Sequence, residues 1–76
     1  MSDEARPRRT PVRSSVIRSV AYDPATATLE VEFVSGAVYQ YDGVRPDLHD
    51  QILRAASKGA FFNRFIKGSF QGRKCA

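Results

Sequence analysis

The stretch Thr28–Tyr41 constrains the fold of this chain more than any other, because it has the pattern of a β-hairpin. In its first half, apolar residues alternate with polar ones at positions 29, 31 and 33, so one side of an extended strand is apolar and the other faces water. Ser35-Gly36 then supplies turn residues, and the return segment is β-branched and aromatic. The pattern predicts a sheet that needs cover on one face.

Tyr39 and Tyr41 share one side of the second strand, and the length of the turn decides which face of the sheet that side is. A two-residue loop pairs Glu32 with Tyr39 and turns both tyrosines to the acidic, open face. A three-residue loop, with Gly36 in a left-handed conformation, pairs Val31 with Tyr39 and turns them to the core. We favour the core, because a short chain needs the area that two buried rings provide.

The flanking segments complete an α+β domain of the order β-β-β-α-α. Ser14–Asp23 is predicted as a first strand with a bulge near Arg18-Ser19, so three strands form an antiparallel meander. Pro46 opens a first helix that is expected to end near Ser57 to Gly59. Ser57 then caps a second helix, Ala60–Lys67, in which Phe61 or Phe62 joins Phe65 and Ile66 on an apolar face. Both helices are expected to pack on one face of the meander.

The length and composition allow one domain of residues 14–70 between two polar ends. Residues 1–13 have four arginines and two prolines and are predicted to be a disordered basic arm, either a flexible clamp or a solubilising leader. Residues 71–76 form a polar, basic tail. No apolar run approaches the ~18 residues that cross a membrane, and no signal peptide is visible, so a cytoplasmic protein without a membrane partner is the simplest interpretation.

The chemistry-bearing residues do not favour an enzyme. His49 is the only histidine and is predicted on the exposed side of the first helix, where a structural histidine is commoner than a catalytic one. Cys75 is the only cysteine and has no activating partner beyond Lys74. No second histidine or cysteine supports a metal site, and no glycine loop binds phosphate, so no cofactor is expected.

Charge separates the chain into regions of opposite sign. The net charge is +2 for residues 1–13, −3 for residues 14–44 and +5 for residues 45–76. A polyanion is therefore expected to bind the helical side and to avoid the strand face that carries Glu30 and Glu32. The candidate nucleic-acid-binding residues are Arg54, Lys58, Asn63, Arg64, Lys67, Arg73 and Lys74.

Several short motifs together resemble the KTSC domain family, named after a C-terminal extension of some lysyl-tRNA synthetases. The resemblance covers about residues 14–70, and it rests on the order of the pieces: Ser15, Val20, Tyr22-Asp23, Phe33, Gly36, Tyr39-Gln40-Tyr41, Val44, Pro46, Ala56-Ser57-Lys58-Gly59, Phe62-Asn63 and Ile66-Lys67. Arg45 is inserted before Pro46, and Phe70 stands where the family often has Tyr. The resemblance implies no established activity. It implies RNA as a ligand only because some members of the family are extensions of lysyl-tRNA synthetases.

Two functions compete. The first is a small non-catalytic module that binds RNA through the basic helical face, although such a face is also common on ordinary solvated helices. The second is a protein-interaction or self-association module, because Phe61 and Phe62 are adjacent and cannot easily face the same core. Salt-dependent RNA affinity would favour the first function, and concentration-dependent association would favour the second.

Overall fold

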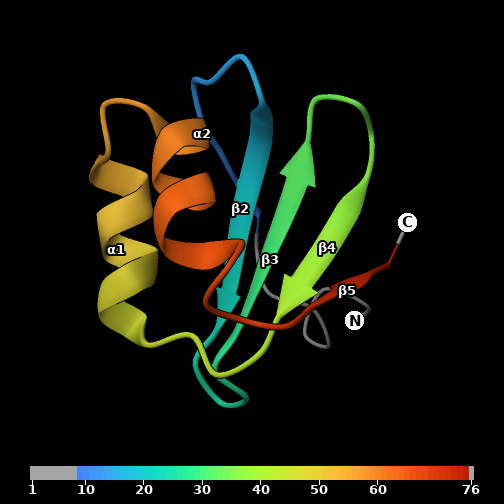
Figure 1. Ribbon diagram of the computed structural model, residues 1–76, viewed down its shortest axis with the longest axis vertical. Helices are drawn as coiled ribbons and strands as arrows, with labels where there is room; N and C mark the ends of the chain where they lie inside the picture. Colours follow the sequence, from blue (N-terminus) through green and yellow to red (C-terminus); the bar gives the residue numbers. More distant parts are fainter. Residues whose placement is uncertain (1–8, 76) are drawn as a thin grey trace.

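The computed structural model describes residues 9–75, which form an antiparallel five-stranded sheet and a helical layer (Figure 1). The strands lie in chain order across the sheet: β1 (Arg9–Pro11), β2 (Ile17–Asp23), β3 (Thr28–Phe33), β4 (Val38–Tyr41) and β5 (Gly72–Lys74). The helices are α1 (Pro46–Arg54), α2 (Lys58–Phe61) and the π-helix η2 (Phe62–Ile66), which continues α2. Figure 1 shows the helices together on one side of the sheet.

The predicted α+β class is confirmed, but the predicted number of strands is too low. β1 lies inside the segment predicted as a disordered arm, so that prediction is wrong for Arg9–Pro11, and the first eight residues lie outside the described part. β5 lies inside the segment predicted as a polar tail. Both extra strands have three residues, all of them exposed, so neither carries the apolar alternation by which a strand is recognised in a sequence.

The predicted bulge in β2 is confirmed. Ile17 is opposite Phe33, yet Ser19 is opposite Glu32, so one extra residue is accommodated between the two pairs. This change of register lets Ile17 and Val20 both lie fully buried although they have opposite parity in the sequence.

The hairpin turn is the three-residue form, and both tyrosines lie on the core side. Gly36 has a φ of +98°, in the left-handed region that favours glycine, and the Phe33 amide donates to the Ala37 carbonyl over 2.9 Å. Val31 is consequently opposite Tyr39, as the core alternative requires.

The helix boundaries differ by a few residues from those predicted. Pro46 is the first residue of α1, as predicted, but the helix ends at Arg54 because Ala55 is already extended, with ψ at 138°. Ser57 caps the second helix as predicted, by accepting a hydrogen bond from the Ala60 amide, so that helix starts at Lys58 instead of Ala60. The five-residue hydrogen bond from the Lys67 amide to the Phe62 carbonyl makes the last turn π-helical.

The core lies between the helices and one face of the sheet. Its fully or nearly buried members come from β2 to β4, the following loop and the helices: Ile17, Val20, Leu29, Val31, Tyr41, Val44, Ile52, Phe62 and Ile66. Phe62 contacts two strands, with ring centroids 5.3 Å from Phe33 and 5.4 Å from Tyr41. The prediction that Phe65 joins this face is wrong, because its side chain is 44% exposed.

Candidate nucleic-acid interface

The seven predicted nucleic-acid-binding residues fall into two groups on opposite parts of the molecule. Arg54, Lys58, Asn63, Arg64 and Lys67 come from the helical layer, and all are exposed except the half-buried Lys58. Arg73 and Lys74 come from β5, which is the last strand on the far edge of the sheet (Figure 1). The structure therefore brings the helical residues to one side and separates the two residues of β5 from them.

The helical group keeps much of its charge free of internal partners. Arg54 is within 3.7 Å of Asp50, one helical turn away, and both side chains are well exposed. The Arg64 guanidinium lies over the Phe65 ring at 5.4 Å from its centroid. Among the described residues, no carboxylate lies within ion-pair distance of Lys58, Arg64 or Lys67. These three cations are available to an external anion.

Arg73 is engaged within the chain instead. Its guanidinium forms an ion pair with Asp42 and donates to the Gln40 side-chain oxygen over 3.2 Å. The hydrogen bond from Arg73 holds the pKa of the Asp42 carboxyl below its ordinary value. Arg73 thus fixes β5 to the end of β4, and its charge is already compensated.

The acidic strand face is also compensated in part. Arg9 of β1 reaches across the sheet and donates from Nε to the Glu30 carboxylate over 2.6 Å, and its Nη1 lies 3.7 Å from Glu32. Ser19 donates to the Glu32 carboxylate over 2.8 Å, and Gln40 donates to the Glu30 carboxylate over 2.9 Å. The acidic face is therefore less open than predicted, because Arg9, a residue of the predicted arm, compensates part of its charge.

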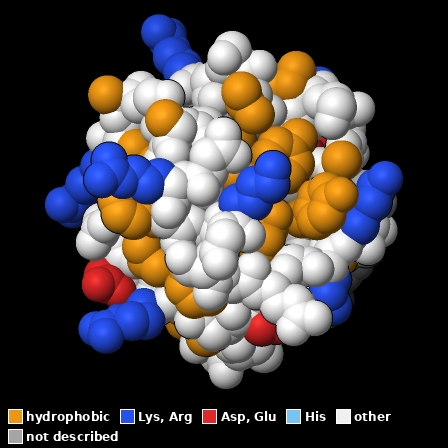
Figure 2. Space-filling model, in the orientation of Figure 1, with side chains coloured by type: hydrophobic (Ala, Val, Ile, Leu, Met, Phe, Trp, Pro, Cys, Tyr) orange, Lys and Arg blue, Asp and Glu red, His pale blue; other side chains and the backbone are white. Residues whose placement is uncertain are grey.

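Figure 2 shows how charge is distributed over the face seen in Figure 1. Lys and Arg side chains are scattered across this face, Asp and Glu side chains are few, and hydrophobic side chains are exposed between the cations. On the face that Figure 2 shows, the basic side chains are thus separate and do not form one continuous strip.

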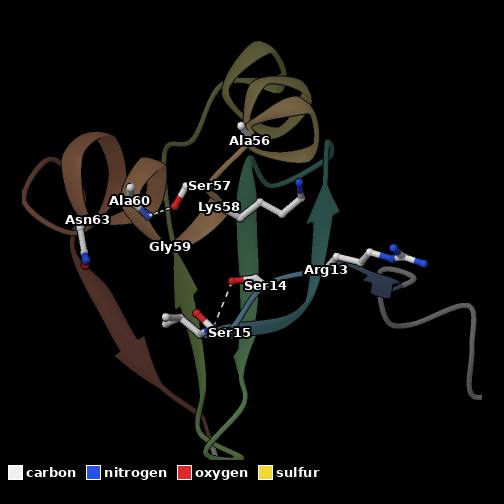
Figure 3. Close-up of a pocket in the computed structure, with 10 residues that line it drawn as sticks. Arg13, Ser14, Ser15, Ala56, Ser57, Lys58, Gly59, Ala60 and Asn63 are labelled. Carbon is white, nitrogen blue, oxygen red and sulfur yellow. Dashed lines mark hydrogen bonds between the residues drawn. The ribbon is translucent and has the colours of Figure 1, made fainter.

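A pocket of about 400 Å³ opens between the segment that leads into β2 and the junction of α1 with α2 (Figure 3). It is lined by two cations, four further polar side chains and four small or apolar residues, namely Arg13, Lys58; Ser14, Ser15, Ser57, Asn63; and Val16, Ala56, Gly59, Ala60. No carboxylate is among these lining residues. Of the predicted site residues, Lys58 and Asn63 lie here.

Local interactions position the walls of this pocket. The Ser14 hydroxyl accepts hydrogen bonds from the amides of Val16 and Ile17, each over 3.1 Å, and so fixes the turn that enters β2. The Lys58 ammonium donates to the Ala55 carbonyl over 2.7 Å, which satisfies a carbonyl at the end of α1. Gly59 allows α2 to lie close to the segment that leads into β2, because a Cβ at this position would lie 3.3 Å from two carbons of Val16.

No binding role was predicted for Ser14, Ser15 or Ser57, and Arg13 was considered only as part of the basic arm. The sequence nevertheless contains a signal for this pocket. Ser15 and the Ala56-to-Gly59 motif both carry the family resemblance, although about forty residues separate them, and they meet around this pocket. Family motifs that are distant in sequence and close in space indicate a shared structural or binding role.

The tyrosines of the family motif lie on the core side of the sheet, where Tyr41 is buried and Tyr39 is half-buried. Tyr41 is 6% exposed, and its ring lies between those of Tyr39 and Phe62 at centroid distances of 6.4 and 5.4 Å. Burial, with a smaller contribution from Tyr39, raises the pKa of the Tyr41 phenol. The exposed aromatic ring beside the cations is Phe65, whose ring centroid is 4.7 Å from that of the half-buried Phe61.

His49 does not lie on the exposed side of α1, contrary to the prediction. Its ring stacks on Tyr22 at a centroid distance of 5.1 Å, and its buried Nε2 has no hydrogen-bond partner in the structure. Burial lowers its pKa from the ordinary 6.5, and the nearby Asp50 opposes that shift. The arrangement indicates a packing role for a neutral imidazole.

We expect this histidine to make stability depend on pH. The unfolded chain binds a proton at His49 near pH 6.5, whereas the folded chain resists it, so the free energy of unfolding should fall as the pH is lowered from about 7 to about 5. His49→Phe keeps an aromatic ring beside Tyr22 and removes the titration. Urea unfolding at several pH values gives the free energy of unfolding as a function of pH, and this dependence should be weaker for the variant. An equal pH dependence in parent and variant would contradict the assignment.

Within residues 9–75, no three His, Cys, Asp or Glu side chains are grouped so that they could hold a metal ion. The helices of this part of the chain are too short and too polar to cross a membrane.

Comparison with known proteins gives concordant matches. A family model described as KTSC domain matches residues 13–70, a range that contains all ten residues lining the pocket. A crystal structure of a KTSC domain protein from Yersinia pestis superimposes with a TM-score of 0.87 at 45% identity, over 91% of this chain and 97% of that one. An uncharacterized protein from Stutzerimonas stutzeri is 45% identical over 60 residues, which are 79% of this chain and 84% of that protein.

The same region is found inside a much larger enzyme. A lysine–tRNA ligase from Nostoc punctiforme is 47% identical over 57 residues, which are 75% of this chain but only 10% of the ligase. A second ligase, from a Nostoc species, is 42% identical over the same length. The chain therefore spans about a tenth of the length of these ligases.

Proposed function

This chain belongs to the KTSC domain family, and from that premise we propose that it is a small non-catalytic module that binds RNA. The binding surface is the exposed side of α2 and η2 together with the adjoining pocket. The observation that carries the proposal is the pocket lining, which contains two cations, three hydroxyls and one amide and no carboxylate. Such a group of donors suits the oxygens of a phosphate backbone.

The surrounding residues support the same function. Lys58, Arg64 and Lys67 have no carboxylate partner among the described residues, so an RNA backbone would not have to displace an internal ion pair. Phe65 is exposed beside Arg64 and offers a ring on which an unpaired base can stack. Single-stranded or looped RNA is therefore the form of the ligand that we favour.

The ligase relatives add an independent argument. A tRNA is named as a substrate of those enzymes, and the KTSC region is one small part of each. A module that contributes backbone contacts would serve a tRNA-handling enzyme and would also function alone. We place the isolated domain in the cytoplasm, where such an RNA ligand is available.

Replacing Arg64 and Lys67 together by Gln should weaken RNA binding without unfolding the domain. Exposed charges contribute little to stability, so the melting temperature should stay nearly constant. When fewer phosphates are contacted, fewer counterions are released on binding, so the slope of log affinity against log salt concentration should decrease in magnitude by about 1–2. Fluorescence anisotropy with several RNA oligonucleotides between low and physiological salt measures both quantities, and the loss should be similar for every sequence.

Lys74→Gln is the matched control, because Lys74 is an exposed cation on β5, at the sheet edge away from the helices. It should change the affinity and the salt slope much less than the helical double variant. Equal RNA binding by the parent and the double variant, or no binding by the parent near physiological salt, would exclude the proposal.

The exposed aromatic also supports a second candidate function, a protein-interaction module. The sequence pointed to Phe61 or Phe62 as the exposed contact residue, but Phe62 is buried and the exposed ring is Phe65, with Arg64 over it. Arg and aromatic side chains are common in the centres of protein interfaces. Sedimentation at increasing concentration tests self-association, and Phe65→Ala should abolish any association that this ring mediates.

A further inference from the structure

We infer that the pocket between the β2 entry segment and the α1–α2 junction is a specific site for one phosphate group of a nucleotide. This inference rests on the proposed function and narrows it, because it separates one defined phosphate site from the scattered cations of the helical surface. The pocket residues keep unused hydrogen-bonding capacity after their internal bonds are counted.

The hydroxyls of the pocket are left mainly with donor capacity. A serine hydroxyl has one donor and two acceptor positions. Ser14 uses both acceptor positions on the amides of Val16 and Ile17, so only its O–H remains for a ligand. Ser57 accepts from the Ala60 amide and likewise retains its donor. A ligand that satisfies both hydroxyls must present acceptor atoms.

The cations of the pocket point to the same chemistry. The Lys58 ammonium has three N–H donors and uses one on the Ala55 carbonyl, which leaves two. Arg13 makes no hydrogen bond or ion pair with any described residue, so its five donors are free. Because no carboxylate lines the pocket, these donors have no internal anion to bind. A phosphate, with several oxygens and a negative charge, matches this surplus of donors.

The volume and position of the pocket fit a nucleotide. About 400 Å³ lies within the range of small-molecule sites and exceeds what a phosphate group alone would fill, so a sugar can enter with it. Figure 3 shows Ser14 and Ser15 on one side of the opening and Ser57, Lys58 and Gly59 on the other. Val16 in the lining is 47% exposed and offers an apolar surface beside the polar groups.

The phosphate can come from a terminal or free nucleotide or from an internal phosphodiester, and the experiment separates these sources. Amide NMR spectra of the domain are recorded with adenosine 5′-monophosphate and with adenosine. The monophosphate should shift the amides of pocket residues such as Ser15 and Gly59, and adenosine should not. An RNA oligonucleotide is then compared with and without a 5′-phosphate. Tighter binding of the phosphorylated form indicates a terminal phosphate, and equal affinity with the same pocket shifts indicates an internal one.

Arg13→Gln tests the site, with Arg45→Gln as the matched control, since both arginines are exposed and only Arg13 lines the pocket. Loss of a charged hydrogen bond should weaken binding of the monophosphate about tenfold for Arg13→Gln and hardly at all for Arg45→Gln. Shifts that are scattered over the surface, or equal effects of the two variants, would overturn the inference.

The two proposals fail in different ways. RNA binding that depends on Arg64 and Lys67 but is unchanged by Arg13→Gln, without monophosphate shifts in the pocket, would overturn the phosphate site and leave the RNA function intact. Pocket shifts with the monophosphate but no binding of any RNA would exclude the RNA function and support a site for free nucleotides.

Discussion

Replacing Phe62 by Ala should destabilise the domain by about 3–5 kcal/mol, the usual cost of removing a buried aromatic side chain. Phe62 is 4% exposed, and its ring meets Phe33 of β3 and Tyr41 of β4 edge-on. It therefore joins the π-helix to two strands at once. A domain of this length has a total stability of about 4–11 kcal/mol, so the variant should be close to unfolding at room temperature. Urea unfolding followed by circular dichroism measures the change.

Phe65→Ala is the matched control for this substitution. It removes the same side chain from the same π-helix, but the ring is 44% exposed and its aromatic partner is the half-buried Phe61. We expect a loss of roughly 1 kcal/mol or less, because little area leaves contact with the core. Similar losses for the two variants would mean that η2 does not present Phe62 to the sheet as described.

The central part of the fold could be predicted from the sequence because each signal there is local. Alternation by two positions identifies β3. The apolar residues of β2 fall on both odd and even positions, so they can face the same core only if β2 contains a bulge. The position of Tyr39 depended on the turn type, which the glycine at position 36 favoured without deciding. The register that places Tyr39 on the core side was preferred because a small core needs the buried area of its ring.

The two edge strands could not be predicted by the same means. β1 and β5 consist of three exposed residues each, so their sequences contain no periodicity. They are held by pairing and by long-range ion pairs, from Arg9 to Glu30 and from Arg73 to Asp42. Both strands also lie outside residues 13–70, the range matched by the family model. A contact between residues more than twenty positions apart leaves no mark in either local sequence.

The candidate site was predictable only in its helical half. Positive charge on α2 and η2 follows from composition and identified Lys58, and Asn63 was predicted as a hydrogen-bonding side chain on the same helical segment. The serines of the pocket look like ordinary turn and cap residues in the sequence, and Ser14 and Ser57 do have those structural roles. Their binding potential arises because Gly59 allows the two segments to approach closely. The pocket is therefore a property of the tertiary structure.

Gly72→Ala should detach β5 or destabilise the domain by about 1–3 kcal/mol through overpacking. A Cβ at this position would lie 2.5 Å from Cε2 of Tyr41 and 3.0 Å from its Cζ. The Tyr41 ring is held in the core by Phe62 and cannot easily move away. β5 has only three exposed residues, so its separation from β4 is the less costly response. Loss of amide protection on β4, measured by hydrogen exchange, would report the separation.

The pKa of Asp42 gives a second measurement of the same event. Its carboxyl owes its lowered pKa mainly to the hydrogen bond from Arg73, which β5 carries. When β5 separates, that pKa should rise toward the ordinary value, and NMR titration of the carboxyl carbon can follow it. Gly68→Ala is the matched control, because a Cβ there would meet no atom within 4 Å. It should change neither stability nor the Asp42 titration appreciably. Retention of both the β4 protection and the low Asp42 pKa in Gly72→Ala would show that β5 does not approach Tyr41 closely.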